Sequence, residues 1–399
     1  MSHVIVIGAG QAGSSAVVKL RNAGFEGEIT LIGAETAPPY QRPPLSKKYL
    51  LGEMDLERLY LRPMDFYAEQ GIILRLGETV TGIDVDTKTI NIGDEKLSYD
   101  HLIFTTGSDP RRLPAAVGGD LDGVYVVRGL TDVDAMQPEF APNRHVLIIG
   151  GGYIGLEAAA VAAKLGLRGT LVALADRILQ RVASTQTSDY FRTLHTSHGV
   201  DIREGVGLSK LIGDTRVTAA ELTDGSTLDV DFVIAGVGIT PSTALAEIAG
   251  CDIENGIKTD AQGRTSVDGI WAAGDCASFP YQGGRIRLES VPNAIDQAEL
   301  IATNIIGGEN EYIAKPWFWS DQFDIKLQIA GLNTGFDNVV SRITDTTTSF
   351  WYYQGEKLLA VDAMNDPRAY MIGKRLIESG KSPDRAAVGD PTTDLKSLM

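Results

Sequence analysis

The sequence contains very little cysteine. Its 399 residues include only two, Cys251 and Cys276, and these do not form a closely spaced pair. A disulfide framework needs several cysteines, and a redox-active dithiol of the common type needs two near neighbours in the chain. The sequence therefore argues against both arrangements, and we expect the two cysteines to be small buried hydrophobic side chains.

Histidine is also scarce, and no metal site is expected. The five histidines match none of the ligand spacings that are typical of zinc sites. His195 and His198 are three positions apart, which would place them on one side of a helix. We interpret them as helix-surface residues rather than as metal ligands.

The chain lacks long apolar segments and an excess of positive charge. No apolar run approaches the roughly 18 residues of a membrane-spanning helix, and the N-terminus enters a strand-like segment at once, unlike a signal peptide. These features predict a cytoplasmic protein without a membrane partner. The formal net charge of −16 disfavours nucleic acid as a partner, although a local basic patch would still suffice to bind an acidic protein.

Glycine, by contrast, is abundant, with 44 residues. Gly8, Gly10 and Gly13 follow an apolar run at 3–7 and open a helix-like segment at 11–23. This order of strand, glycine turn and helix is typical of a dinucleotide-binding unit. Its glycines permit a tight turn, close approach of a pyrophosphate and close helix–strand packing, and the helix N-terminus offers unpaired N–H groups to the anion.

The same pattern occurs a second time. Gly150, Gly152 and Gly155 follow the apolar run at 145–149 and open another segment rich in Ala, Val and Leu. A single match of this kind is weak evidence, because short glycine patterns are common. Two matches in one chain predict a protein that holds two dinucleotides, for which electron transfer between them is the usual reason.

Two segments beyond the first fingerprint also indicate a nucleotide site. The predicted strand at 28–32 leads to Glu35, about 20 residues after Gly13, where an acid is expected to accept hydrogen bonds from an adenosine ribose; a surface glutamate is the alternative. Four prolines stiffen residues 38–48. This segment resembles a rigid linker or a docking motif, but its position favours a scaffold that holds Arg42 and Lys47 against a bound cofactor.

The later sequence patterns predict where the chain changes domain. Residues 80–104 alternate as in an antiparallel meander and end in a strand at 99–104, before a Thr-Gly turn at 106–107. An apolar strand followed by glycine recurs at 233–238. Residues 270–276 are predicted as a late strand that ends in Gly274 and Asp275, where the aspartate either binds a ligand hydroxyl or caps a turn.

From about residue 320 the pattern changes again. Strand-like segments at 326–331, 338–343, 349–354 and 357–362 precede a predicted helix at 366–379. This order predicts a separate α+β domain after the two nucleotide-binding units.

Together these motifs resemble the FAD-dependent ferredoxin reductases of the putidaredoxin reductase type, which serve haem monooxygenases and Rieske-type oxygenases. The resemblance covers essentially the whole chain. It rests on the first fingerprint and on residues 39–47, 106–107, 150–157, 273–276, 289–294 and 317–322. It implies an α/β, glutathione-reductase-like fold: an FAD domain at 1–107 and 238–320, an NAD(P)H-binding domain at 108–237, and a C-terminal α+β domain at 321–399.

The resemblance assigns a catalytic role to Lys47 and Glu157. Lys47 would lie near flavin N5, close to Glu157 at the start of the second helix. When hydride arrives at N5, negative charge develops on the ring. A fixed ammonium would stabilise that charge while the carboxylate orients the amine. The alternative for Lys47 is a surface lysine beside Lys48.

The resemblance also implies a set of cofactor-binding positions. It places Asp275 on the ribityl chain, and Trp319 near the flavin or towards the ferredoxin, although a Trp-Phe-Trp run also fits a hydrophobic core. The full set is Gly8, Gly10, Ala12, Gly13, Glu35, Arg42, Lys47, Gly107, Arg111, Gly150, Gly152, Tyr153, Ile154, Gly155, Arg177, Arg181, Gly274, Asp275, Val291 and Trp319.

One position departs from the family pattern. NADH-specific members end the second strand of the second unit with an acid, but here the strand at 170–172 leads to Ala173. Ala173 offers no hydrogen-bond acceptor to an adenosine ribose and no charge to repel a 2′-phosphate. With Arg177 and Arg181 nearby, the loop is compatible with NADPH, with relaxed specificity or with weakly held NADH. Asp176 would replace the missing acid if the loop folds back, and NADH stays slightly ahead on family grounds.

We therefore interpret the chain as a ferredoxin reductase. Hydride would pass from NAD(P)H to FAD, and single electrons would pass to a two-iron two-sulfur ferredoxin that feeds a monooxygenase or dioxygenase. We expect a monomer, with candidate ferredoxin-docking bases near Arg285, Arg287 and Lys326. Two alternatives remain: an NAD(P)H oxidase or quinone reductase on the same fold, and a flavoprotein redox sensor with an impaired nicotinamide site.

Overall fold

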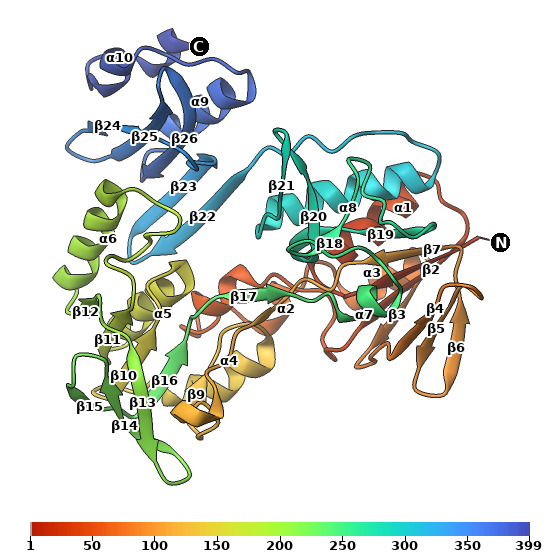
Figure 1. The fold of residues 1–399 in the computed structure, drawn as a ribbon, viewed down its shortest axis with the longest axis horizontal. Coiled ribbons are helices and arrows are strands. Elements are labelled where there is room, and N and C mark those ends of the chain that lie inside the picture. The colour runs from red at the N-terminus through yellow and green to blue at the C-terminus, as the bar shows by residue number, and fades with distance from the viewer. Residues whose placement is uncertain (1) are drawn as a thin grey trace. The chain divides into compact units, whose positions relative to one another are not determined.

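A computed structural model describes residues 2–399, which form two compact units (Figure 1). Unit 1 comprises residues 2–42, 55–109 and 239–316, and unit 2 comprises residues 43–54, 110–238 and 317–399. Strands β8 (Ser108–Pro110) and β17 (Ile239–Pro241) mark where the chain leaves unit 1 and later re-enters it.

The centre of unit 1 is a five-stranded parallel sheet. Its order is β19 (Ile270–Ala272), β7 (His101–Phe104), β1 (His3–Ile7), β2 (Glu28–Gly33) and β3 (Ile72–Leu76). This is the order of a doubly wound sheet, in which the strand order reverses beside the first strand. A ligand is expected at that reversal, outside the carboxyl ends of β1 and β7.

Helices and smaller sheets complete unit 1. Helix α1 (Gln11–Asn22) ends before Gly24, whose φ of +88° suits glycine, and α8 (Val291–Ile305) packs along α1 in one hydrophobic core. The remaining elements are α2 (Leu56–Leu59), α3 (Met64–Glu69), α7 (Ala244–Ile248), the antiparallel strands β4 (Gly82–Asp84), β5 (Thr89–Ile92) and β6 (Glu95–Ser98), the 3-10 turn η4 (Gly274–Cys276), and β18 (Ile257–Lys258), β20 (Ala277–Tyr281) and β21 (Gly284–Ile286).

Unit 2 repeats the parallel architecture. Its first sheet has the order β12 (Asp201–Glu204), β11 (Arg168–Ala173), β10 (His145–Ile149), β16 (Phe232–Ala235) and β9 (Val124–Tyr125), and all its pairs are parallel. Helices α4 (Leu130–Met136), α5 (Tyr153–Lys164) and α6 (Thr185–Ser197) belong to this half. The other elements are η1 (Pro43–Ser46), η2 (Ala115–Val117), η3 (Gln137–Glu139), and the antiparallel strands β13 (Leu208–Gly213), β14 (Val217–Leu222) and β15 (Thr227–Asp229).

The C-terminal part of unit 2 is an antiparallel sheet with helices. Its order is β22 (Trp317–Gln322), β23 (Ile325–Gly331), β26 (Lys357–Met364), β25 (Thr348–Gln354) and β24 (Asn338–Ile343). Helix α9 (Pro367–Glu378) packs on β26 and β23, and α10 (Arg385–Gly389) and η5 (Leu395–Leu398) follow it (Figure 1).

Most of the predicted elements are confirmed, and two need correction. The late strand was predicted at 270–276, but β19 ends at Ala272 and residues 274–276 turn in η4, because Gly274 adopts φ +81°. The strand predicted at 99–104 begins only at His101, where β7 joins the parallel sheet. The C-terminal sheet contains β22, which the sequence patterns did not predict as a strand.

Candidate functional site

The first fingerprint folds as a tight turn at the end of β1. Gly8 has φ +115°, and an added Cβ would lie 2.2 Å from the carbonyl oxygen of Thr105, which follows β7. At Gly13 an added Cβ would lie 2.1 Å from the Gly8 carbonyl oxygen. Both positions therefore require glycine for the fold itself, since no side chain fits between the strand ends and the helix.

The second fingerprint has the same geometry at the end of β10. Gly150 also has φ +115°, and its added Cβ would lie 2.2 Å from the carbonyl oxygen of Gly236, which follows β16. The added Cβ of Gly155 would lie 2.2 Å from the Gly150 carbonyl oxygen. The two loops are built alike, each at the reversal point of its parallel sheet.

The middle glycine of each fingerprint differs from the others. At Gly10 and Gly152 an added Cβ would meet no atom within 4 Å, and both φ values are negative, at −96° and −85°. Neither packing nor backbone conformation requires glycine there. The open space lies at the N-termini of α1 and α5, which have no side-chain cap and no acidic residue in the first turn. Both sites therefore fit the pyrophosphate of a dinucleotide.

Glu35, Tyr40 and Arg42 form a hydrogen-bonded group after β2. Tyr40 donates its hydroxyl to Glu35 Oε2 at 2.5 Å, and Arg42 donates Nη2 to Glu35 Oε1 at 2.6 Å. Burial lowers the pKa of Arg42, but its interactions with Tyr40, Glu35 and Asp275 raise it above its ordinary value. The structure thus brings Glu35 and Arg42 together, and the sequence predicted neither this contact nor the one with Tyr40.

The remaining predicted residues of unit 1 lie around η4. An added Cβ at Gly274 would lie 3.2 Å from Ala12 Cβ, which brings η4 against the start of α1. Ser108 donates its hydroxyl to Asp275 Oδ2 at 3.2 Å. Val291 opens α8, and Gly107, with φ +70°, follows β7. Asp275 lies inside the first turn of η4, whose N-cap residue is Ala273.

Lys47 and Glu157 form a buried ion pair in unit 2. Lys47 Nζ lies 2.7 Å from Glu157 Oε2 and donates a further bond to the Pro43 carbonyl at 3.2 Å. The Glu157 side chain is only 4% exposed. The predicted pair is therefore present in the fold, whereas Lys48 is exposed.

Two serines complete the surroundings of Glu157. Ser46 donates its hydroxyl to Oε2 at 2.6 Å, and Ser320 from β22 donates its hydroxyl to Oε1 at 2.6 Å. A buried carboxylate is tolerated when opposite charge and hydrogen-bond donors surround it. Sequence reasoning missed both serines, although each stands inside a motif that was recognised, at 39–47 and 317–322.

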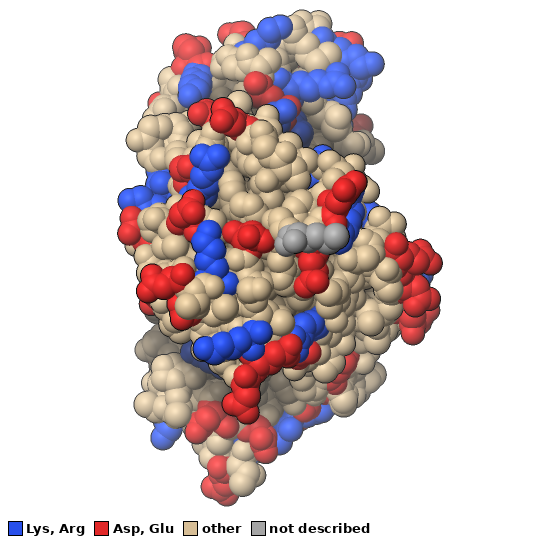
Figure 2. Space-filling view, turned by 90° about the vertical axis from the view of Figure 1, so that its right-hand side faces the viewer, with Lys and Arg blue, Asp and Glu red and all other residues tan. Residues whose placement is uncertain are grey.

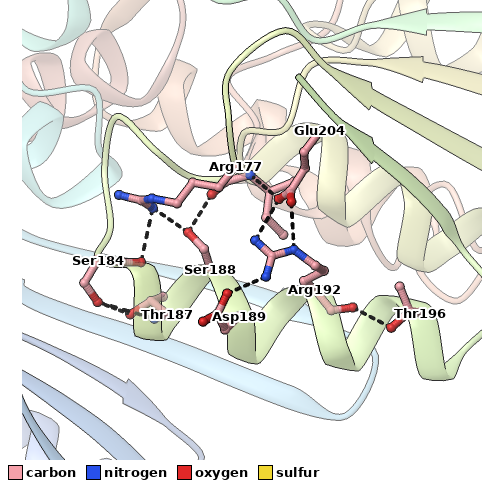
Figure 3. Close-up of polar contacts among 9 residues, drawn as sticks. Arg177, Ser184, Thr187, Ser188, Asp189, Arg192, Thr196 and Glu204 are labelled. Carbon is pink, nitrogen blue, oxygen red and sulfur yellow. Dashed lines mark hydrogen bonds and ion pairs between the residues drawn. The ribbon is translucent and has the colours of Figure 1, made fainter. Parts of the chain in front are cut away.

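The loop after β11 shows how Ala173 and Arg177 are placed. Ala173 is buried at the end of β11, in register with Glu204 on β12. Arg177 turns its guanidinium onto its own loop: it donates to Ser188 Oγ at 2.5 Å and to the Ser184 carbonyl at 3.2 Å (Figure 3). It also donates to the Ala183 carbonyl at 2.8 Å. Its charge is therefore engaged within the protein, whereas Arg181 and Asp176 are exposed.

Glu204 anchors the same loop from the other side. It accepts the backbone N–H of Ile178 at 2.7 Å and pairs with Arg192 of α6 at 2.9 Å (Figure 3). Sequence reasoning did not identify Glu204. Its position as an acid at the end of β12, the strand that pairs with β11, could have indicated that it lies near this loop.

The aromatic residues near the second fingerprint lie along β22. Tyr153 packs on Phe318 with ring centroids 5.0 Å apart, and burial raises its pKa. Trp319 stacks on Trp317 at 5.6 Å and is half-buried. Ile154 and Arg111 are exposed, and the Arg111 backbone N–H bonds to the Gly238 carbonyl.

Two predictions about polar residues are wrong or weakened. His195 is not a surface residue: it is fully buried and bonds through Nε2 to Gln322 Oε1 at 2.8 Å, and burial lowers its pKa to about 4. Arg285 and Arg287 are largely buried and donate to backbone carbonyls of Ser278 and Asp275, so they do not form a free docking patch. Lys326 is exposed.

Other parts of the described chain offer no competing centre. Cys251 and Cys276 are both buried, as predicted, and both are free thiols. Residues 2–399 contain no group of three or more His, Cys, Asp and Glu side chains placed to hold a metal ion. Within the same residues, no helix is both long and apolar enough to span a membrane. On the face shown in Figure 2, the described Lys and Arg side chains are interspersed with Asp and Glu.

Comparison with known proteins places these features in context. Residues 2–298 match the pyridine nucleotide-disulphide oxidoreductase family, and residues 317–399 match the reductase C-terminal family. The chain is 42% identical to a ferredoxin–NAD(P)(+) reductase of a Sphingomonas species, over 99% of this chain and 97% of the relative. It is 40% identical to the rhodocoxin reductase of Rhodococcus erythropolis, over 98% and 93% of the two chains.

The solved structures agree with the sequence comparison. The reductase chain in the crystal structure of the covalent putidaredoxin reductase–putidaredoxin complex matches with a TM-score of 0.96 and 39% identity, covering 100% of this chain and 98% of that one. The predicted fold class is thereby confirmed.

Proposed function

The chain belongs to the pyridine nucleotide-disulphide oxidoreductase family, and we propose that it works as an NAD(P)H-dependent flavoprotein ferredoxin reductase. The observation that carries this proposal is the buried Lys47–Glu157 pair, which stands in one chain with two dinucleotide loops of matching geometry. The relatives named as ferredoxin and rhodocoxin reductases, which align over nearly the whole chain, support it.

The residues of unit 1 fit FAD. In this proposal Gly8, Gly10 and Gly13 hold the pyrophosphate, Glu35 with Arg42 holds the adenosine end, and Asp275 binds the ribityl chain. We propose residues 1–107 and 238–320 as the FAD domain, 108–237 as the NAD(P)H domain and 321–399 as the C-terminal domain, although the C-terminal sheet already begins with β22 at Trp317. When bound, FAD would supply the hydride-accepting and one-electron chemistry of the reaction.

Lys47 provides the fixed positive charge that this chemistry needs. The Glu157 carboxylate and the Pro43 carbonyl hold its ammonium in one position, so no reorganisation is needed when negative charge develops next to it. Because Glu157 is buried and bonded to two serines, the ammonium has little freedom to turn away.

We propose NADH rather than NADPH as the better substrate. Arg177 would be the natural partner of a 2′-phosphate, but its guanidinium is engaged by Ser188 and by loop carbonyls. Only Arg181 presents an exposed cation from this loop, and the exposed Asp176 stands close to it in sequence. The expected result is a lower dissociation constant for NADH than for NADPH; the reverse order would overturn this preference.

The partner in this proposal is a two-iron two-sulfur ferredoxin that feeds an oxygenase. The putidaredoxin complex of the matching reductase supports a small electron carrier as the partner. The protein is proposed to act as a cytoplasmic monomer. Of the predicted docking bases only Lys326 stays available, so charge alone does not define the docking surface.

The decisive measurement is anaerobic stopped-flow mixing with NADH and with NADPH, following flavin absorbance near about 450 nm. Rapid bleaching is expected, followed by electron transfer to added putidaredoxin. Lys47→Gln should slow bleaching by about a hundredfold, as expected when a group that stabilises developing charge is lost. Lys48→Gln is the matched control and should behave as the wild type.

The other outcomes separate the alternatives. Bleaching followed by fast turnover with dioxygen or quinone, and none with putidaredoxin, would identify an oxidase or quinone reductase. No bleaching by either nucleotide would contradict the reductase proposal and favour a redox sensor.

A further inference from the structure

A row of buried polar side chains, joined by hydrogen bonds, extends from Glu157 Oε1, the carboxylate oxygen opposite the one that pairs with Lys47. Ser320 bonds to Glu157 Oε1, and Gln322 donates its Nε2 to Ser320 Oγ at 3.1 Å. His195 bonds to Gln322 Oε1 at 2.8 Å. Ser320, Gln322 and His195 are all fully buried. This row of side chains links α5, β22 and α6 within unit 2. The function proposed above uses only Ser320 from it.

The direction of every bond in this row follows from the charge on Glu157. A carboxylate only accepts, so the single hydroxyl proton of Ser320 must point to it. The lone pairs of Ser320 then accept from the Gln322 amide nitrogen, which leaves the amide oxygen towards His195. His195 must therefore carry its proton on Nε2, and its Nδ1 is left without a hydrogen-bond partner.

His195, Gln322 and Ser320 thus donate hydrogen bonds in one direction, each to the next side chain, and Ser320 donates the last of them to the Glu157 carboxylate. Hydrogen bonds arranged head to tail polarise one another and are stronger in a water-excluded interior. Burial lowers the pKa of His195 to about 4, so the imidazole is neutral at neutral pH and contributes a dipole rather than a charge.

The alternation of β22 explains how one strand reaches two helices. Phe318, Ser320 and Gln322 share one face of the strand, where they meet Tyr153, Glu157 and His195. Two strand residues span about 6.6 Å and four helical residues span about 6 Å, so Phe318 and Ser320 match Tyr153 and Glu157 in spacing. Asp321 is exposed on the opposite face.

We propose that Ser320, Gln322 and His195 are positioning residues that set the field at the nicotinamide–flavin site through Glu157 and Lys47. This inference rests on the proposed function. It adds residues of the C-terminal sheet and of α6 to those that orient the Lys47 ammonium. Loss of these hydrogen bonds is expected to leave the Glu157 side chain free to turn. The Lys47 ammonium would then no longer point to where negative charge develops.

Ser349 offers a close control for Ser320. It is also a fully buried serine of the same sheet, on β25. Its hydroxyl donates to a carboxylate oxygen of Asp366 at 3.3 Å and accepts from the Trp351 indole, two positions along the strand. Ser349→Ala therefore removes a similar hydroxyl bridge without touching Glu157.

The test compares holoenzymes of Ser320→Ala and Ser349→Ala by two readouts. These are the midpoint potential of the bound flavin, titrated with a chemical reductant, and the limiting rate of flavin reduction at saturating NADH. Ser320→Ala should give a more negative potential and a limiting rate about tenfold lower, as expected for losing one bond to a charged group. The NADH dissociation constant should stay within about twofold, and Ser349→Ala should match the wild type throughout.

Further variants keep the test decisive. His195→Gln retains an N–H that reaches Gln322 and should preserve the potential, whereas His195→Leu should lower it. If Ser320→Ala fails to retain FAD, Gln322→Met replaces it, because methionine has a similar shape but donates no hydrogen bond, and it should also lower the potential. Wild-type potentials in Ser320→Ala or Gln322→Met, or equal behaviour of the two His195 variants, would overturn the inference.

These outcomes are distinguishable from failure of the proposed function. Neither readout involves a ferredoxin, and the potential requires no nucleotide. Even if the protein reacts with neither putidaredoxin nor NADH, the midpoint potential of the bound flavin would therefore still show whether these buried hydrogen bonds affect it.

Discussion

At the scale of single residues, the glycines of the two loops fall into two kinds. Gly8 and Gly150 have positive φ and face a carbonyl oxygen, so the fold requires them. Gly10 and Gly152 have ordinary backbone angles and open space before them. The first kind is needed for folding, and in the proposed function the second kind makes room for a ligand, so the two requirements can be measured separately.

Alanine at the second kind of glycine should impair one cofactor at a time. Gly10→Ala is expected to lower the FAD content of the purified protein, because its Cβ would occupy the space of a pyrophosphate. Gly152→Ala should retain FAD but raise the NADH dissociation constant by tenfold or more, about 1.4 kcal/mol. The thermal midpoint of either apoprotein should equal that of wild-type apoprotein. Gly8→Ala should unfold at a clearly lower temperature, and equal midpoints for Gly8→Ala and Gly10→Ala would contradict this division.

At the scale of elements, a buried acid joins α6 to the C-terminal sheet. Asp362 of β26 is fully buried and accepts hydrogen bonds from Thr187 at 2.7 Å and from Tyr352. Tyr352 in turn accepts the backbone N–H of Ser184, the N-cap of α6, at 3.0 Å. No cation is among its hydrogen-bond partners in the described residues. Burial raises the pKa of Asp362 to about 6.

This junction should make stability depend on pH in a defined window. The folded pKa of Asp362 lies above its ordinary value of 3.8. Its contribution is therefore fully present below about pH 4 and is lost as the pH rises through about 6. The loss should amount to roughly 3 kcal/mol.

Asp362→Asn provides the measurement. Asparagine keeps an acceptor for Tyr352 without a charge, so the variant should gain stability relative to the wild type as the pH rises from 4 to 7. Thermal midpoints of the wild type and the variant at the same pH give this difference in stability. Other titrating groups affect both proteins equally and therefore cancel. A constant difference across the range would mean that Asp362 does not titrate in this window.

At the scale of the whole molecule, local sequence patterns predicted much of the architecture. Apolar runs before glycine turns located β1, β10 and their helices, because strand, turn and helix are encoded by adjacent residues. The C-terminal strands β23 to β26 were found in the same way. The pairing of Lys47 with Glu157 came from the family resemblance, since no local pattern joins residues so far apart in the chain.

The parts that were missed depend on long-range burial. Ser320 meets Glu157 across 163 positions, and His195 meets Gln322 across 127. Nothing near His195 in the sequence distinguishes a buried histidine from an exposed one. Arg177 shows the same difficulty, because its guanidinium, which was predicted to contact a ligand, bonds to its own loop and to Ser188.

Removal of FAD should destabilise the whole protein. A ligand that binds only the folded chain stabilises it by about 2.7 kcal/mol when present at a hundred times its dissociation constant. Apoprotein should therefore unfold at a lower temperature, and added FAD should raise the midpoint in proportion to the logarithm of its concentration. The Gly10→Ala apoprotein should respond less to the same additions. A midpoint that is independent of FAD would show that the folded chain does not bind it.

The match between β22 and α5 also limits how this region can change in length. Because alternate residues of a strand face opposite sides, inserting or deleting one residue between Trp317 and Ser320 would exchange the two faces. An insertion would bring the Trp319 indole to the position that faces Glu157, and a deletion would bring the Asp321 carboxylate there. In both cases the Ser320 hydroxyl would point away from Glu157. Substitutions in β22 alter one contact each, but a shift in its register would remove them all. A library that diversifies this protein should therefore vary the identity of residues in 317–322 and leave their number unchanged.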